Sequence, residues 1–133
     1  MTQQKLIDWA VLLLRIVAGY LFVLNGGVKL FGWFNMIPDG TDLPTLLVVA
    51  GIIELVAGIL IAIGLFTRSA TFISAGQMAV AYFMAHVPTG FWYAPVANDG
   101  QPSVLLCFIF LFFAAYGAGI WSVDEWIGMR RRR

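Results

Sequence analysis

The chain has 133 residues, of which 61% are hydrophobic and only 11% are charged, and its formal net charge is +1. Ordinary globular proteins have about 45–50% apolar and about 25% charged residues, and so short a chain would not bury this much apolar surface in water. These values exclude a soluble enzyme, a nucleic-acid-binding protein and a disordered tail. They predict an integral membrane protein that forms one all-helical domain over residues 1–133.

Four apolar segments match the length of a membrane-spanning helix, which is about 20 residues. In chain order they cover residues 9–31, 44–66, 69–87 and 104–121, with connections at 35–43, 67–69 and 88–102. Short connections make neighbouring helices antiparallel, so the predicted fold is an all-α integral membrane four-helix up-down bundle. The first segment is too long for a cleaved signal peptide, and Arg15 interrupts it.

The basic residues predict the orientation of the bundle. Lys5, Arg68 and the run Arg130–Arg133 would share one side, while the other side would carry only Lys29 together with three aspartates. By the positive-inside rule, both termini and the tight second loop lie in the cytoplasm. The expected location is therefore the inner (plasma) membrane of a bacterium, as a multi-pass protein.

The residues after the fourth segment predict a short interfacial helix. Ser122 and Glu125 have the spacing of a capping box, directly after Trp121. The arginines at the end of the chain would then lie among anionic lipid headgroups. The alternative for residues past Met129 is a disordered basic tail that serves topology alone.

Two charged residues fall inside the predicted spans. A charge near the centre of a span costs about 2.5–3.5 kcal/mol, so Arg15 and Glu54 are expected to form an ion pair between the first two helices. Gln77 lies at a similar depth and is a third candidate member of this intramembrane polar site. Small residues such as Ala50 and Gly58 flank the acid and would place it against protein. The pair would either be purely structural or bind a polar substrate or proton.

A second polar group is expected near the outer surface. It contains Asn25 and Lys29 at the end of the first span and His86 at the end of the third. On a regular helix His86 points about 180° from Gln77, so the outer and inner groups are predicted to be separate. His86 is a candidate for ligand contact or proton exchange, and the alternative is an interfacial histidine wetted by headgroups.

Cofactor motifs do not appear in the sequence. One histidine and one cysteine exclude a multi-histidine metal site, a disulfide framework and a CxxC relay within the chain. Cys107 is expected to act as a small hydrophobic residue. Haem-attachment, Walker and dinucleotide-binding motifs are missing, so neither a metal nor a covalently bound cofactor is expected.

The order of these residues resembles the DoxX family of small bacterial inner-membrane proteins over nearly the whole chain. The matching pieces are LLLRIVAGYLFVLNGGVKLFGW, GIIELVAGILIAIGLFTRSA, the histidine that ends the third span, and YGAGIWSVDEWIG. The chain departs from the pattern at Ala118, where relatives have proline, at Trp121, where they have tyrosine, and at Asn25, where they often have histidine.

The resemblance implies a four-helix membrane fold, and it links some relatives to oxidoreductase systems, including a thiosulfate:quinone oxidoreductase. Three functions follow as hypotheses: a membrane subunit or anchor of a redox assembly, with quinone as a candidate cofactor; an oligomeric small-solute transporter-like module; or a ligand-free scaffold. The expected partners are membrane lipid, further copies of the chain or redox proteins, and not nucleic acid. The sequence leaves open whether the chain is itself an enzyme.

Overall fold

The computed structural model describes the backbone of residues 1–131 and the side chains as far as residue 128, and every regular element in this range is a helix. The main helices are α1 (Gln3–Phe31), α2 (Thr45–Ile63), α3 (Thr67–Ala81), α4 (Gln101–Tyr116) and α5 (Val123–Arg131). A π-helical turn, η2 (Tyr82–His86), and a 3₁₀ turn, η3 (Val87–Thr89), continue α3, and a 3₁₀ turn, η1 (Trp33–Asn35), follows α1. The prediction of an all-helical chain is confirmed for these residues.

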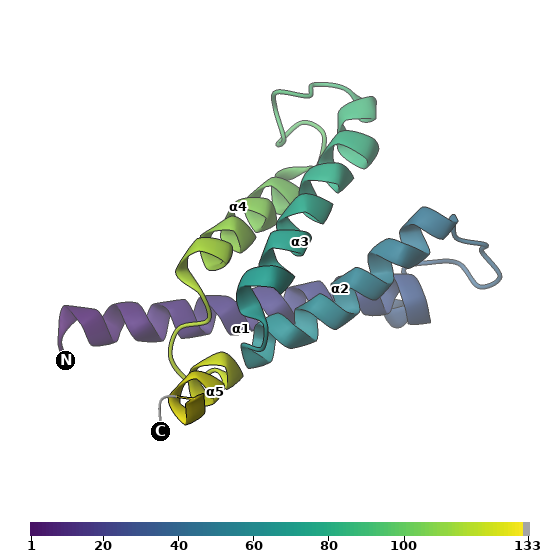
Figure 1. Cartoon of the computed structure of the whole chain (residues 1–133). Helices are drawn as coiled ribbons and strands as arrows, with labels where there is room; N and C mark the ends of the chain where they lie inside the picture. The colour runs from purple at the N-terminus through teal and green to yellow at the C-terminus, as the bar shows by residue number, and fades with distance from the viewer. Residues whose placement is uncertain (132–133) are drawn as a thin grey trace.

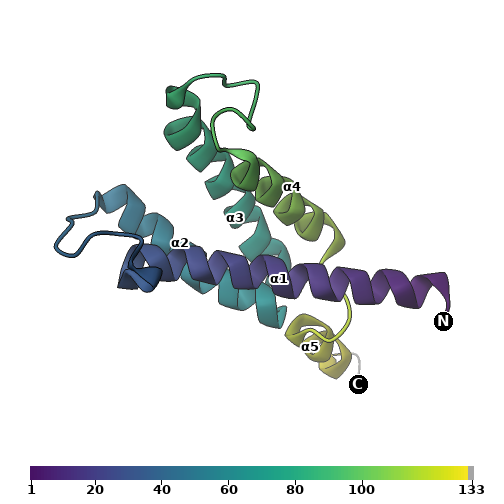
Figure 2. The same ribbon diagram turned by 180° about the vertical axis from the view of Figure 1, so that it is seen from behind.

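The four long helices form two antiparallel hairpins. Helix α1 packs along α2, and α3 packs along α4, whereas the α2–α3 and α1–α4 contacts are much less extensive. Figures 1 and 2 show the two hairpins diverging from the region of the α2–α3 turn, so that together they form a V. The two hairpins are splayed apart, so a closed up-down four-helix bundle stays a prediction.

The hydrophobic core lies where the two hairpins meet. Phe22 of α1 and Phe110 of α4 are completely buried, and their rings make an edge-to-face contact with centroids 4.8 Å apart. Residues of all four helices join them in one buried cluster: Ala18, Ala57, Ile61, Ala70, Ala75, Met78 and Leu106. This shared core fixes the position of one hairpin on the other.

Helices α1 and α2 approach each other through glycines. A Cβ atom added at Gly19 would lie 2.7 Å from the backbone nitrogen of Ala62, and one added at Gly26 would lie 2.6 Å from that of Leu55. Gly51 and Gly58 supply the facing surface of α2. The predicted role of the small residues, a close approach of two helices, is therefore confirmed.

The turn between α2 and α3 comes earlier in the chain than predicted. Helix α2 ends at Ile63, Gly64 adopts a left-handed conformation with φ 74°, and α3 already begins at Thr67. Glycine adopts this conformation without a Cβ penalty and commonly ends a helix, which explains why the connection lies at 64–66 rather than at 67–69.

The prediction that the fourth helix continues to residue 121 is wrong. Helix α4 ends at Tyr116, and an irregular linker of residues 117–122 follows, in which Gly117 and Gly119 have positive φ values of 93° and 72°. Two glycines within three residues favour such a break, since glycine pays little for left-handed backbone.

The predicted C-terminal helix is confirmed as α5. The backbone nitrogen of Glu125 donates to Ser122 Oγ at 3.1 Å, and Glu125 Oε2 accepts from the backbone nitrogen of Trp121 at 2.9 Å. This is a capping box shifted by one residue, because its glutamate reaches the residue before the serine. The side chains of Arg130–Arg133 lie outside the described part of the chain, so their contact with lipid stays a prediction.

Among the described residues 1–131, two helices are long and apolar enough to cross a membrane. These are α1, with 29 residues, and α2, with 19 residues, while α4 is a shorter apolar helix. Large exposed apolar side chains on both helices, among them Leu13, Val17, Ile52 and Val56, would face lipid in such a setting.

Candidate functional site

Arg15 of α1 holds the α4–α5 linker by hydrogen bonds. Its side chain is 1% exposed, and its guanidinium donates to the backbone carbonyl oxygens of Ala118, Ile120 (3.3 Å) and Trp121 (2.8 Å). Carbonyl groups in an irregular segment have no helical partner, and at membrane depth each unsatisfied group costs several kcal/mol. Arg15 therefore supplies the hydrogen bonds that the linker itself does not.

The expected ion pair between Arg15 and Glu54 does not form. The guanidinium carbon of Arg15 lies beside Gly64, where an added Cβ atom would be 3.1 Å from it, so Arg15 is level with the end of α2. Glu54 lies ten residues before Gly64, or about 15 Å along the helix. The first part of α1, residues 3–14, extends beyond the end of α2, so Arg15 lies too far along the helix pair to reach Glu54.

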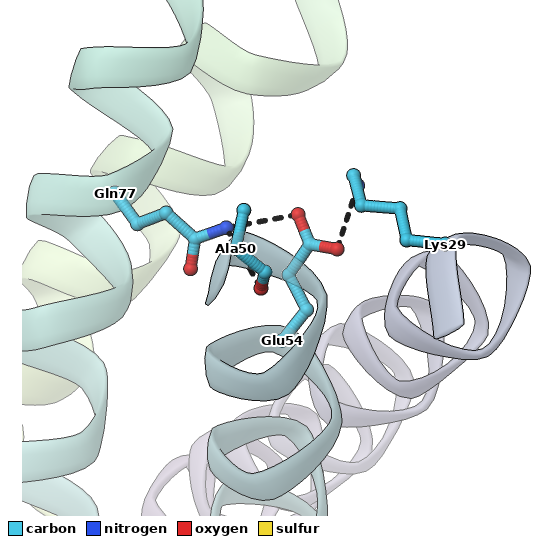
Figure 3. A network of polar contacts seen from close by, with 4 residues as sticks. All are labelled: Lys29, Ala50, Glu54 and Gln77. Atoms are coloured by element: carbon cyan, nitrogen blue, oxygen red, sulfur yellow. Dashed lines mark hydrogen bonds and ion pairs between the residues drawn. The ribbon is translucent and has the colours of Figure 1, made fainter. Parts of the chain in front are cut away.

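Glu54 instead lies at the centre of a network that joins three helices (Figure 3). Its Oε2 atom forms an ion pair with Lys29 Nζ of α1 at 2.6 Å. Its Oε1 atom accepts from Gln77 Nε2 of α3 at 2.9 Å, and the same amide nitrogen lies 3.4 Å from the carbonyl oxygen of Ala50. The Glu54 side chain is 3% exposed, and the Lys29 side chain is 25% exposed. Glu54 therefore bonds to one residue of its own hairpin and to one residue of the other hairpin.

This network opens into a cavity of about 570 Å³ in the V between the hairpins. Its polar lining consists of Asn25, Lys29, Glu54, Gln77, His86, Asp99 and Ser103. Most of the remaining wall is aliphatic, with Leu46, Leu47, Val49, Ile53, Ile73, Met78, Val80, Met84 and Leu106. A mostly apolar cavity with a few polar groups is the usual form of a site for an amphipathic small molecule.

The prediction of separate inner and outer polar groups is wrong. Gln77 and His86 both line this cavity, although nine residues of regular helix would turn them to opposite sides. The π-helical turn at Tyr82–His86 lies between them and changes the angular spacing of the residues, so His86 turns toward the cavity. Lys29, which was assigned to the outer group, is the ion-pair partner of Glu54.

The loop over residues 90–100 fixes the orientation of His86. Its Nδ1 atom lies 3.0 Å from the carbonyl oxygen of Asn98, and its Nε2 atom lies 3.4 Å from Ser103 Oγ. Asn98 is 4% exposed, and its amide nitrogen donates to Tyr82 Oη at 3.1 Å and to the carbonyl of Phe91 at 3.3 Å. Asn98 Oδ1 also accepts from Gly100 N at 2.9 Å, and the link of Asn98 to His86 was not predicted from the sequence.

Several polar residues of the site were not predicted from the sequence. Ser103 and Asp99 line the cavity, and Asn98 supports it.

Cys107 is half-buried, carries a free thiol and packs beside the core. Among residues 1–128, no three metal-ligating side chains lie close enough to hold an ion.

Comparison with known proteins supports the resemblance noted from the sequence. The family model described as DoxX matches residues 10–87. A protein of Haemophilus influenzae that is described only as uncharacterized is 41% identical over 115 residues, which cover 84% of this chain and 86% of that protein. No solved structure matches the chain with significance. The matched range contains Arg15, Lys29, Glu54, Gln77 and His86.

Proposed function

This chain belongs to the DoxX family, and from that premise we propose that it is a membrane subunit or anchor of an oxidoreductase system that binds a quinone-like ligand. The ligand would occupy the cavity between the two hairpins. The proposed location is the bacterial inner membrane, with four spans and with both termini in the cytoplasm. The proposed partners are membrane lipid and either a redox protein or further copies of the chain.

The observation that carries this proposal is the amphipathic cavity. Its volume of about 570 Å³ lies within the range of sites for small organic molecules, roughly 300–1,000 Å³. Its aliphatic wall would accept an apolar ring and tail, while Lys29 and Asn25 would donate hydrogen bonds to ring oxygens. Arg15 lies among linker carbonyls and has no part in this binding.

The supporting role of the chain follows from its chemistry. A quinone supplies redox chemistry by itself, and the cavity residues would only bind and orient it. In this proposal the electrons come from a partner protein, to which the chain presents the quinone. An anchor that offers a quinone to such a partner is therefore the role proposed.

The alternative is a ligand-free scaffold, and the contacts of Arg15 favour it. The Arg15 guanidinium donates its hydrogen bonds to backbone carbonyls of the linker and does not line the cavity. If the Glu54 network also had only a structural role, the cavity would hold only lipid chains. A transporter-like oligomer would instead need a second copy to complete a pathway.

Direct analysis of the purified protein separates these functions. The chain would be purified from bacterial membranes in mild detergent, and its organic extract would be analysed for quinones by chromatography and mass spectrometry. We expect quinone in a fixed ratio to protein, and a loss of most of it in Ala81→Phe, which fills the cavity. Ala79→Phe lies two residues earlier on α3, outside the cavity lining, and is the matched control. A quinone content equal to that of an unrelated membrane protein would contradict the proposal.

A further inference from the structure

We propose that the cavity between the hairpins binds its ring ligand in the hydroxyl-bearing, reduced form in preference to the carbonyl-bearing, oxidised form. This inference rests on the proposed function and adds the chemical form of the ligand. It depends on which hydrogen-bonding groups of the cavity wall are acceptors and which of them lack a strong donor.

His86 presents an acceptor to the cavity. Its Nδ1 atom lies 3.0 Å from the carbonyl oxygen of Asn98, and a carbonyl oxygen only accepts, so Nδ1 carries the hydrogen. In the neutral ring Nε2 then has the free lone pair. The Ser103 hydroxyl is 3.4 Å from this atom, longer than an ordinary hydrogen bond, and so leaves Nε2 able to accept a better-placed donor.

One further acceptor lies in the same wall, the exposed Asp99 carboxylate. The Gln77 amide directs its NH₂ group to Glu54 and Ala50, and its Oε1 atom is buried away from the cavity surface. The charges of Lys29 and Glu54 cancel, so Asp99 leaves the lining with a formal charge of −1, which disfavours an anionic ligand.

The donors of the cavity suit a hydroxyl group as well as a carbonyl. Lys29 uses one of its three ammonium hydrogens on Glu54, and Asn25 has an amide NH₂ group. A hydroxyl accepts from these groups and also donates to an acceptor such as His86 Nε2. A quinone carbonyl only accepts, so it would make no hydrogen bond to His86 Nε2. The hydrogen bond that a hydroxyl group gains at this atom strengthens its binding, by up to about tenfold.

Binding measurements on the full-length chain in detergent test this inference. A short-chain benzoquinone and its two-electron reduced hydroquinone would be titrated separately by calorimetry, without oxygen. We expect the hydroquinone to bind about tenfold tighter. His86→Phe, which keeps a ring without an acceptor, should bring the two dissociation constants to within about twofold of each other. His86→Asn should do the same, while its amide can still donate to the Asn98 carbonyl and support the loop. Tyr93→Phe, in the same loop but outside the cavity lining, should keep the preference.

The outcomes separate this inference from the proposed function. If neither form binds to the wild-type chain, the proposed function fails and this inference fails with it. If both forms bind equally, or the quinone binds tighter, the inference is overturned and the proposed function stands. A preference for hydroquinone that survives in both His86 variants would overturn the role given to the His86 acceptor.

Discussion

Arg15 Nη2 donates to the carbonyl oxygen of Trp121 at 2.8 Å, a contact that joins residues 106 positions apart in the chain. With its bonds to Ala118 and Ile120, it attaches α1 to the linker between α4 and α5. One planar guanidinium donates to three carbonyls, two through Nη1 and one through Nη2, an arrangement that a single ammonium group does not reproduce. Arg15 therefore stabilises the fold by joining α1 to the α4–α5 linker.

Replacement of Arg15 should destabilise the protein strongly. Arg15→Ala leaves three carbonyls without a donor, and hydrogen bonds to a charged group contribute about 1.5–3 kcal/mol each. We expect a loss of at least about 3 kcal/mol in the free energy of unfolding, and a smaller loss for Arg15→Lys. Denaturant titration in detergent, followed by circular dichroism, measures both. Glu54→Ala should add to Arg15→Ala without coupling, because the two residues do not touch. A coupling above about 1 kcal/mol would contradict the separation of these charges.

The Lys29–Glu54 ion pair should respond unequally to the loss of each partner. Lys29→Met keeps the aliphatic stem but leaves the carboxylate, which is 3% exposed, without its counter-charge. Glu54→Gln leaves an ammonium group that is 25% exposed and reaches the cavity on a flexible stem. We expect Lys29→Met to cost roughly 3 kcal/mol and Glu54→Gln about 1 kcal/mol. In the double variant the cost should be below the sum, and equal costs for the two single variants would argue against this asymmetry.

The helices and the family pattern could be predicted from the sequence, but the pairing of the buried charges could not. Sequence position alone does not show that α1 begins 12 residues before it reaches the level of Gly64 at the end of α2. The glycines set the register in which α1 packs on α2. Gly19 faces Gly58 and Ala62, and Gly26 faces Gly51 and Leu55, and this register carries Lys29 toward Glu54.

The other differences come from local backbone conformations that no periodic pattern reveals. The π-helical turn at Tyr82–His86 reorients His86, and the break at Gly117 shortens the fourth helix. Both depend on how the loop over residues 90–100 and the α4–α5 linker pack. The capping box at Ser122 was predictable because it is a short-range signal that acts within one turn.

A methyl group at Gly19 should force α1 and α2 apart. The added Cβ would lie 2.7 Å from Ala62 N and 2.8 Å from Gly58 O, and both are backbone atoms that do not rotate away. We expect Gly19→Ala to cost about 1–3 kcal/mol, as overpacking does in other cores. Gly76→Ala on α3 is the control, since nothing lies within 4 Å of its added Cβ. It should be neutral or stabilise by up to about 1 kcal/mol. Thermal unfolding of the two variants in the same detergent gives the comparison.

Asp124 should stabilise the start of α3 from outside that helix. Its Oδ1 and Oδ2 atoms accept from the backbone nitrogens of Phe66 and Thr67 at 2.8 and 2.9 Å, although Asp124 belongs to α5. The removal of a capping side chain costs about 0.5–2 kcal/mol. We expect Asp124→Ala to lose about that much and to raise amide hydrogen exchange at residues 66–70. Asp8→Ala, which loses only an exposed bond to Gln4, should leave this exchange unchanged. Unaltered exchange in Asp124→Ala would show that the cap does not hold the turn.

The proposed orientation in the membrane can be tested through the α2–α3 turn and the long outer loop. Arg68 donates to the carbonyl of Ala115 at 2.7 Å, so this basic residue lies at the same end of the molecule as the end of α4 and the linker. By the positive-inside rule that end faces the cytoplasm, and the loop over residues 90–100 faces the periplasm. Alkaline phosphatase, which is active only after export, should be inactive when fused after Arg133 and active when inserted after Val96. A β-galactosidase fusion, active only in the cytoplasm, should give the reverse pattern at the two positions. An active phosphatase after Arg133 would mean that the C-terminus is exported. The two hairpins would then span the membrane in the opposite sense to the proposed one.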